Sequence, residues 1–271
     1  MNKYRVLIAM FLIGVILACA RVPITGRRQM KLLPESTLIG MSSSAYSDFL
    51  ASSQQVPATD DDAAMVERVG KRIAKAVEKY LEDNRKSNRV SGFDWSFKLV
   101  NDPTVNAWCM PGGRIVFYTG ILPITKDENG LATVMGHEIA HAIARHGNER
   151  MSQQIAIQGA GASLNAMASE QPELTRNILL QSYGVGSALG SLAYSRRHEA
   201  EADHMGLIFM SLAGYDPREA PKFWERMSEA AGAGGQVPEM LRTHPSDDKR
   251  IANLNEKMDE AMFYYNQNKP D

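Results

Sequence analysis

The sequence predicts an α+β domain that is mostly helical, with a small β-sheet beside one central helix. Apolar residues recur at helical spacing after the acidic run at 60–62. Residues 92–100 and 114–119 are rich in aromatic and β-branched side chains, which is typical of strands. Residues 128–146 again carry a helical pattern. Strands gathered in one stretch between helices indicate the α+β class.

The segments before the sheet are predicted to be a tether and two helices. Residues 20–34 are interpreted as a tether, and residues 35–50 are serine-rich but periodic enough for a helix. The next helix begins at Asp60–Asp62 and is strongly amphipathic. Its apolar positions are Met65, Val69, Ile73 and Val77.

The sheet is predicted from a single stretch of chain. Residues 92–100 read GFDWSFKLV and form the first strand, and residues 107–111 are a candidate continuation. Pro111–Gly113 is a turn signal, after which residues 114–119 form another strand.

The chain after the sheet is predicted to be helical. Asp127 is a candidate N-cap for the helix over 128–146, and Gly147 is a stop signal. Residues 151–194 are rich in Ala, Gly and Ser, which favours closely packed helices over the alternative of a mobile loop. Further helices are predicted over 195–212 and 246–265, with a break at 214–217 and a flexible link at 230–235.

Composition and charge exclude several classes of protein. A hydrophobic content of 44% with 23% charged residues is that of a folded domain rather than a disordered chain. The formal charge of -1 excludes a strong general attraction to nucleic acid. The two cysteines provide neither a disulfide framework nor a cysteine-rich metal site. Because no histidine precedes His137, histidine chemistry is confined to the second half of the chain.

The N-terminus has the features of an export signal with a lipid attachment site. Lys3 and Arg5 precede an apolar run over 6–18, which has the length of a signal-peptide core and is short for a membrane span. The run ends in ILAC, which resembles a bacterial lipobox with Cys19 as the acylated residue. A plain signal peptide or a signal anchor is the alternative.

These features predict the organisation and the location of the chain. We expect a signal peptide over 1–18, a lipidated tether over 19–34 and a single domain over 35–271. Because Ala20 rather than Asp follows the cysteine, we expect a bacterial outer-membrane lipoprotein that faces the periplasm. Lipid on Cys19 would hold the protein to the membrane.

A metal site is predicted inside the helix over 128–146. His137, Glu138 and His141 form the pattern H-E-x-x-H. Residues four apart on a helix lie about 40° apart on one face, so both imidazoles can point at one zinc ion. Glu138 lies beside that ion and can accept a proton from an attacking water. Two surface histidines on an amphipathic helix are the alternative.

The third ligand distinguishes the classes of enzyme that share this motif. The metzincin pattern needs Gly and His three and six residues after the second histidine, where this chain has Ala144 and Gly147. His146 lies about 180° around the helix from His137 and is interpreted as a helix C-terminal cap. A carboxylate from a second helix is the remaining option.

The segment SRRHEAEAD offers such a carboxylate. Glu199 and Asp203 are four residues apart, so Glu199 can bind the metal while Asp203 accepts a hydrogen bond from a ligating histidine. Glu201 points away from this face and is interpreted as solvated or salt-bridged. His198 and His204 are expected beside the site rather than in it. An ordinary charged helix is the alternative.

Together, the motifs HEIAH, SRRHEAEAD and RTHPS resemble those of the family-forty-eight (M48) zinc metallopeptidases. Residues 25–29, 106–108 and 110–116 also resemble segments of that family, and the likeness is greatest to its compact LoiP-like lipoprotein members. The resemblance implies a zincin-like (gluzincin) fold and one Zn²⁺ per chain. It assigns His137, His141 and Glu199 as zinc ligands and Glu138 as the catalytic base. Asp203 would accept a hydrogen bond from a ligating histidine.

The resemblance also implies roles around the metal. His244 would stabilise the oxyanion or occupy the fourth metal position, and a structural histidine at the start of the last helix is the alternative. The strand that begins at Arg114 would bind the substrate backbone by strand addition. Cys109 is interpreted as a small buried hydrophobe. The expected substrate-binding residues are Asn106, Gly113, Arg114, Ile115, Val116 and Phe117.

The sequence therefore predicts a zinc endopeptidase that hydrolyses unfolded or misassembled cell-envelope proteins, and the substrate follows from the resemblance alone. The alternative is a metal-gated chaperone or assembly factor whose protease site is largely latent, with residues 151–194 as a lid and His244 as a plug. A purely structural zinc domain is disfavoured, because it would leave Glu138 without a task.

Overall fold

The predicted small sheet has three strands, and its strand order decides which strand is free at the edge. The computed structural model describes residues 19–158, 195–232, 237–244 and 249–270. The strands are β3 (Ser96–Val100), β4 (Ala107–Met110) and β5 (Arg114–Tyr118). β5 lies in the middle, parallel to β3 and antiparallel to β4. Among the described residues, β4 therefore forms an edge of the sheet.

A tight turn joins β4 to β5. Gly112 and Gly113 both have positive φ values, of 87° and 78°, which glycine adopts without steric strain. A Cβ atom on Gly113 would also lie 2.5 Å from the ring of Trp95. The turn signal in the sequence thus corresponds to a hairpin that only glycine fits.

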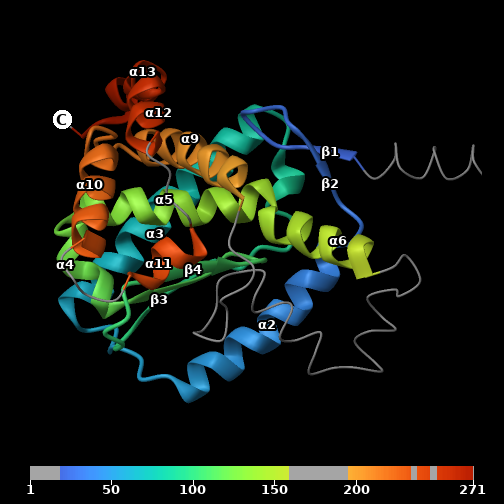
Figure 1. Cartoon of the computed structure of the whole chain (residues 1–271), viewed down its shortest axis with the longest axis horizontal. Coiled ribbons are helices and arrows are strands. Elements are labelled where there is room, and N and C mark those ends of the chain that lie inside the picture. The colour runs from blue at the N-terminus through green and yellow to red at the C-terminus, as the bar shows by residue number, and fades with distance from the viewer. Residues whose placement is uncertain (1–18, 159–194, 233–236, 245–248, 271) are drawn as a thin grey trace, which may run out of the picture.

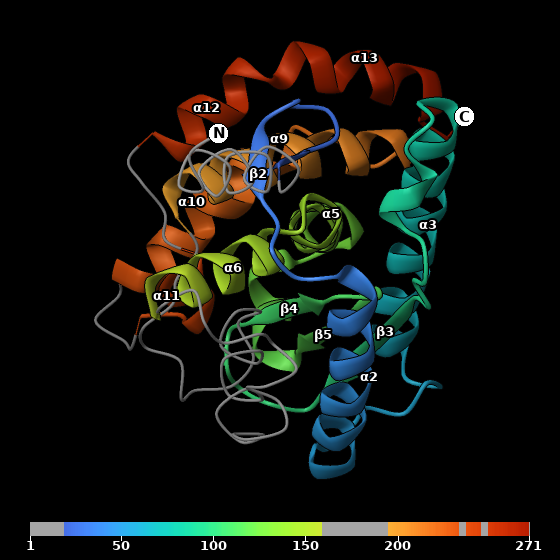
Figure 2. The same ribbon diagram turned by 90° about the vertical axis from the view of Figure 1, so that its right-hand side faces the viewer.

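Helix α5 (Glu128–Ala144) occupies the centre of the fold, and its residues from Gly130 to Ala144 are all buried. Figure 2 shows α5 end-on, with β4 and β5 on one side and α9 (Arg196–Leu212) on the other. α3 (Asp61–Asp83) packs along the side of this stack, and α2 (Glu35–Ser52) covers the opposite face of the sheet. The predicted fold class, mostly helical with a small sheet beside the central helix, is confirmed.

The remaining elements complete the shell around α5 (Figure 1). They are the short helices η1 (Ser87–Arg89), η2 (Thr119–Ile121) and α4 (Leu122–Thr125), then α6 (His146–Gln158), α10 (Glu219–Gly232), α11 (Glu239–Thr243), α12 (Arg250–Glu256) and α13 (Met258–Asn268). None of the helices in the described part of the chain combines the length and apolar character needed to span a bilayer.

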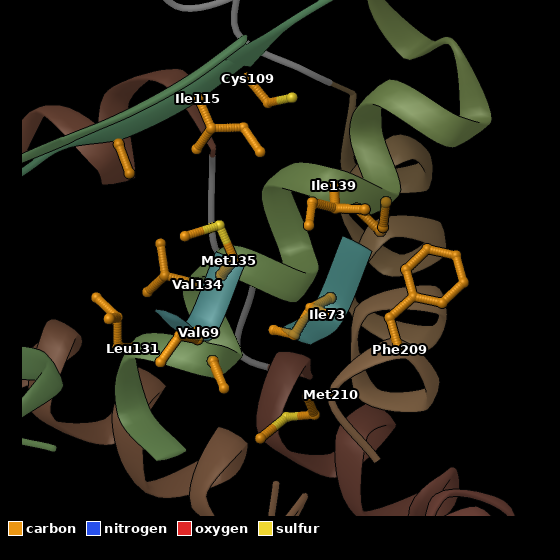
Figure 3. Packing of buried hydrophobic residues seen from close by; sticks show 14 of the residues in the cluster. Val69, Ile73, Cys109, Ile115, Leu131, Val134, Met135, Ile139, Phe209 and Met210 are labelled. Carbon is orange, nitrogen blue, oxygen red and sulfur yellow. The ribbon is translucent and has the colours of Figure 1, made fainter. Parts of the chain in front are cut away.

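The core explains why the predicted periodicities are correct. Side chains from α3, the sheet, α5 and α9 meet in one cluster, in which Ile73, Ile115, Ile139 and Phe209 are fully buried (Figure 3). A second cluster fills the space between α2 and the other face of the sheet. Because the sheet is covered on both faces, β4 is a continuous apolar run and β5 is one after Arg114.

Helices α5 and α9 approach each other closely at two glycines. A Cβ atom on Gly206 would lie 2.8 Å from the backbone nitrogen of His137, and one on Gly136 would lie 2.7 Å from the carbonyl oxygen of Gly206. This contact brings the H-E-x-x-H motif next to the acidic first turn of α9.

The structure corrects the predicted tether over 19–34. This segment contains the antiparallel strands β1 (Cys19–Arg21) and β2 (Arg28–Met30), and Val22 is fully buried. The Gln29 side chain donates a hydrogen bond to the carbonyl oxygen of Ala144, at the end of α5. The segment is therefore a hairpin packed on the domain. Residues 1–18, predicted as a signal peptide, lie outside the described residues.

Two helix boundaries also differ from expectation. The helix predicted over 128–146 ends at Ala144, because Arg145 takes the left-handed conformation and α6 begins at His146. The last predicted helix is two helices, α12 and α13, which meet at Lys257. Most of the glycine-rich stretch over 151–194, and half of the link at 230–235, lie outside the described residues.

Candidate metal centre

Helix α5 presents two imidazoles to one point. Asp127 caps the helix as expected, by accepting hydrogen bonds from the backbone nitrogens of Asn129 and Gly130. His137 and His141 are both buried, and their Nε2 atoms lie 3.1 Å apart. The spacing of four residues thus places both nitrogen atoms on the same face, as the sequence predicts.

The first turn of α9 brings a carboxylate to the same point. The Ser195 side chain caps this helix by accepting a hydrogen bond from the backbone nitrogen of His198. The Oε2 and Oε1 atoms of Glu199 lie 3.4 Å from Nε2 of His137 and 3.4 Å from Nε2 of His141, respectively. Burial opposes ionisation of Glu199, but the imidazoles of His244 and His137 hold its pKa below its usual range.

His244 is the fourth member of this cluster. It follows α11, is buried, and places Nδ1 3.3 Å from Nε2 of His137 and 3.2 Å from Oε1 of Glu199. One ligand atom from each of His137, His141, Glu199 and His244 lies within 4.8 Å of the others. The histidine at the RTHPS motif is therefore part of the centre, whereas Pro245 and Ser246 lie outside the described residues.

The donor set fits zinc. Imidazole nitrogen and carboxylate oxygen are ordinary zinc ligands, and two histidines with one glutamate form a familiar catalytic set. Oε2 of Glu199 is buried and accepts no hydrogen bond, with Nε2 of His137 at 3.4 Å and Nη2 of Arg250 at 3.5 Å. A buried carboxylate is costly unless cations and hydrogen-bond donors satisfy it. A metal ion among the ligand atoms would satisfy this oxygen atom, which favours a metal at this position.

Glu138 lies beside the ligands but is not one of them. It is buried, and its Oε1 atom is 3.5 Å from Nε2 of His244. Burial raises the pKa of the Glu138 carboxyl, which strengthens it as a proton acceptor once ionised.

Asp203 lies directly behind His137. Its Oδ1 atom is 2.9 Å from Nδ1 of His137 and accepts a hydrogen bond of 2.6 Å from Arg250. Burial acts to lower the pKa of His137, but the carboxylates of Asp203 and Glu199 raise it to about 9. The guanidinium of Arg250 also lies 3.2 Å from the ring centroid of Trp224. Arg250 and Trp224 are neighbours of the site that the sequence interpretation missed, since neither belongs to a motif with metal-ligand spacing.

The other neighbours of the site correct one interpretation and decide between the two alternatives of another. His146 is not a cap on the far side of α5, since its Nδ1 atom lies 2.9 Å from Nδ1 of His141. Glu201 is salt-bridged rather than solvated: it is buried, and its Oε2 atom lies 2.7 Å from Nε of Arg27 and 2.9 Å from Nε2 of His146. His198 pairs with Glu149, and His204 pairs with Glu260, so both lie outside the ligand cluster.

The structure contradicts the expected substrate strand. Ile115, Val116 and Phe117 are fully buried in β5, whose two edges are hydrogen-bonded to β3 and β4. A central strand has no free edge, so β5 cannot pair with a substrate. Arg114 forms an ion pair with Asp94 at 2.8 Å.

The other residues expected to bind substrate lie at the ends of β4. Gly113 is in the turn between β4 and β5 and accepts a hydrogen bond from the backbone nitrogen of Ser96. Asn106 directly precedes edge strand β4 and is buried, with Oδ1 unsatisfied. Cys109 is a buried hydrophobe within β4, and burial raises its thiol pKa well above the usual value.

Comparison with known proteins gives relatives that share most of the chain. The chain is 34% identical over 245 residues to the mitochondrial metalloendopeptidase OMA1 of Schizosaccharomyces pombe, which covers 89% of this chain and 67% of the relative. It is 36% identical over 196 residues to OMA1 of Arabidopsis thaliana, over 71% of this chain and 38% of the relative. It is 33% identical over 162 residues to the beta-barrel assembly-enhancing protease of Escherichia coli, over 58% of this chain and 33% of that protein.

These relatives contradict the predicted location. Proteins named as mitochondrial, from fungi, a plant and mammals, match between 71% and 91% of this chain. The prediction of a bacterial outer-membrane lipoprotein facing the periplasm is therefore wrong. A basic flank followed by an apolar run is shared by several kinds of targeting segment, so residues 1–18 could not identify the compartment.

The sequence profile of peptidase family M48 matches residues 63–258. The match includes all but the first two residues of α3, the sheet, the two helices α5 and α9 that carry the candidate ligands, and His244. The cluster of three histidines and a glutamate, which contains the set of two histidines and one glutamate, agrees with the zinc chemistry of that family. The chain therefore belongs to peptidase family M48 and is a zinc metalloendopeptidase.

Proposed function

We propose that this metallopeptidase cleaves unfolded or misassembled membrane-associated proteins, in particular envelope proteins. The observation that carries the proposal is edge strand β4, which is packed against α5, the helix of the H-E-x-x-H motif. Among the described residues, no strand pairs with its outer edge. The four residues of β4 are buried, so whatever covers this edge must move before a substrate strand can pair with it. Strand addition recognises the backbone of an extended chain and selects little for sequence. The name of the Escherichia coli relative, which has 33% identity, supports envelope proteins as substrates.

The residues of the centre have separable roles in this proposal. His137, His141 and Glu199 would hold zinc. When bound, zinc polarises the peptide carbonyl and favours attack by water. Glu138 accepts a proton from the attacking water and passes it to the leaving amine. The Oε1 atom of Glu138 points into the cluster without a hydrogen bond, so it is free to accept that proton.

Glu138→Gln tests this assignment. We expect the variant to bind zinc like the wild type and to cleave unfolded casein about 10²–10⁴-fold more slowly, because it removes a general base and no ligand. A tightly folded protein of similar size is the substrate control. Undiminished cleavage by Glu138→Gln would exclude Glu138 as the base. Equal cleavage of folded and unfolded substrates would exclude selection of unfolded chains.

A largely latent protease that acts as a metal-gated assembly factor is the second candidate. It is favoured by the position of His244, whose Nδ1 atom lies among the ligand atoms. In a latent state, this imidazole would occupy the position that water or substrate needs. The lid proposed for this state falls mainly on residues 159–194, outside the described residues.

His244→Ala separates the two candidates. If His244 blocks the centre, casein cleavage increases and the metal remains bound. If it stabilises the oxyanion instead, cleavage falls by about 10²–10³-fold. Zinc content measured beside activity distinguishes either result from simple loss of the metal.

Membrane attachment through Cys19 stays a prediction, and the closer likeness to LoiP-like members depends on the same residue. Cys19 begins β1, where it pairs in register with Met30. Labelling with palmitate and comparison with Cys19→Ala tests acylation. Label retained by the variant would exclude this site.

A further inference from the structure

One of the two proposed zinc-binding histidines has a second histidine as its hydrogen-bond partner. The Nε2 atom of His141 faces the ligand cluster, 3.1 Å from Nε2 of His137. Its other ring nitrogen, Nδ1, lies 2.9 Å from Nδ1 of His146. A neutral imidazole that binds metal through Nε2 carries its proton on Nδ1. The Nδ1–H group of His141 therefore donates to His146, whose Nδ1 atom must accept.

This requirement determines the tautomer of His146. Because Nδ1 accepts, the proton of His146 lies on Nε2, which is 2.9 Å from Oε2 of Glu201. The donors thus run in one direction, from the ligand His141 through His146 to the carboxylate of Glu201. Loss of the carboxylate would remove the group that favours this tautomer.

Glu201 is held in place by the N-terminal hairpin. Nε of Arg27 donates to Oε2 of Glu201 at 2.7 Å, and the hydroxyl of Thr25 donates to Oε1. The other end of the Arg27 guanidinium binds Glu149 on α6, at 2.7 Å. Figure 1 shows β1 and β2 beside the first turns of α9 and α6, the two helices that carry these carboxylates.

The burial of the Glu201 carboxylate needs a structural explanation. It is 7% exposed, although an ionised carboxylate away from water is unfavourable unless it is paired and hydrogen-bonded. Glu201 is not a member of the ligand cluster. Glu201 instead contacts His146, which is hydrogen-bonded to His141, and the hairpin residues Thr25 and Arg27.

We propose that Glu201, through His146, is a positioning residue for the zinc ligand His141, and that Thr25 and Arg27 of the hairpin hold Glu201 in place. The inference rests on the ligand set proposed above. It gives residues 25–27, part of a segment that resembles the family, a function, which is to support the metal centre from the N-terminal hairpin. Groups of this kind behind a ligand typically change metal affinity about 10–100-fold.

The test is made with the full chain and two readouts that do not depend on cleavage. Zinc affinity is measured by competition with a chromophoric chelator, and the ligand field by the visible absorption of the cobalt-substituted protein. We expect His146→Leu and Glu201→Gln to weaken zinc binding about tenfold or more and to shift the cobalt bands. Glu128→Gln, which removes a carboxylate at the other end of α5, is the matched control and should change neither.

His146→Asn distinguishes a positioning role from simple packing. Asparagine is smaller than histidine but keeps an acceptor near His141, whereas leucine fills the space without one. If His146 positions the ligand, the asparagine variant binds zinc more tightly than the leucine variant. If His146 only fills space, the asparagine variant is equally weak or weaker, and the proposal is overturned.

Thr25→Val keeps the test decisive if the buried variants do not fold. Thr25 is exposed, and valine has the same shape without the donor to Glu201. We expect a loss in zinc affinity of about two- to threefold, with a measurable shift of the cobalt bands. An unchanged spectrum in Thr25→Val and in every folded variant of His146 and Glu201 would overturn the proposal. Zinc retained by His141→Ala would instead exclude the ligand set itself.

Discussion

The two imidazoles that α5 contributes to the candidate ligand cluster have different groups behind them. Behind His137, the carboxylate of Asp203 makes direct contact at 2.9 Å, and Arg250 secures that carboxylate from the C-terminal part of the chain. Behind His141, a second imidazole separates the ligand from its carboxylate, and the hairpin at residues 25–27 secures that carboxylate. The two contacts behind the ligands thus come from segments more than 200 residues apart in the chain.

This difference shows how one helix can serve both sides of a site. Glu199, Glu201 and Asp203 all lie on α9, and all three are buried. Glu199 and Asp203 reach the metal cluster and His137, whereas Glu201 faces the hairpin and His146. The centre therefore has two halves, one behind His137 and one behind His141. A change that separates α9 from α5 should disturb both halves, whereas a change behind one of these histidines should disturb only that half.

The largest effect is expected from Gly206→Ala, which disturbs both halves together. The added methyl group would meet the backbone of His137 at 2.8 Å, so α5 and α9 must move apart. We expect zinc affinity to fall at least about a hundredfold, and the free energy of unfolding to fall by about 1–3 kcal/mol. Chelator competition and urea unfolding measure the two quantities.

Gly40→Ala is the matched control. Gly40 lies in α2 with no atom within 4 Å of the added methyl, so helix propensity alone should stabilise the protein by up to about 1 kcal/mol. Its zinc affinity should equal that of the wild type. If Gly206→Ala also binds zinc normally, then the close approach of α5 and α9 is not what assembles the centre.

The half behind His137 could be predicted from sequence, whereas the half behind His141 could not. Residues four apart on one helix share a face, so helical geometry offers Glu199 and Asp203 as a pair, and the family resemblance selects them. The same geometry placed His146 on the far side of α5. That placement failed because the helix ends at Ala144 and Arg145 takes the left-handed conformation, which redirects the chain. A helical-wheel argument holds only within one continuous helix.

The strand order and the hairpin could not be predicted from sequence either, because both depend on contacts between residues far apart in the chain. Each strand of the sheet has a local signal, but the parallel pairing of β3 with β5 is a long-range contact, and it leaves β4 at the edge. The segment 19–34 has little periodicity, so it was interpreted as a tether. Its fold depends on Arg27, whose partners Glu149 and Glu201 are more than 120 residues away.

A smaller loss of zinc affinity is expected from variants that disturb only one half of the centre. We expect Asp203→Asn to weaken zinc binding toward the upper end of about 10–100-fold, and Glu201→Gln toward the lower end. Asp203 is in direct contact with its ligand, whereas the influence of Glu201 passes through His146. Because the two carboxylates support different ligands, their effects on binding free energy should add in the double variant. Equal losses, or a double variant no weaker than Asp203→Asn, would contradict two separate supports.

The smallest effect on the metal is expected from Glu149→Gln, which loosens the hairpin without touching His146 or Glu201. Burial opposes ionisation of Glu149, but hydrogen bonds from His198 and Arg27 lower its pKa to about 2, from the ordinary 4.5. A carboxyl whose pKa is depressed by folding stabilises the fold at pH values above its pKa in the unfolded chain, and this stabilisation is lost as pH falls from about 4.5 through about 2.

At pH 7 we expect the variant to be less stable by about 1–3 kcal/mol, with zinc affinity within about threefold of the wild type. Unfolding of the metal-free proteins across this pH range should show the difference disappearing at the acid end. A difference in stability that persists at pH 2 would show that the ionised carboxylate of Glu149 is not its source. A loss of zinc affinity as large as that of Glu201→Gln would show that Glu149 belongs to the support of His141 rather than to the hairpin alone.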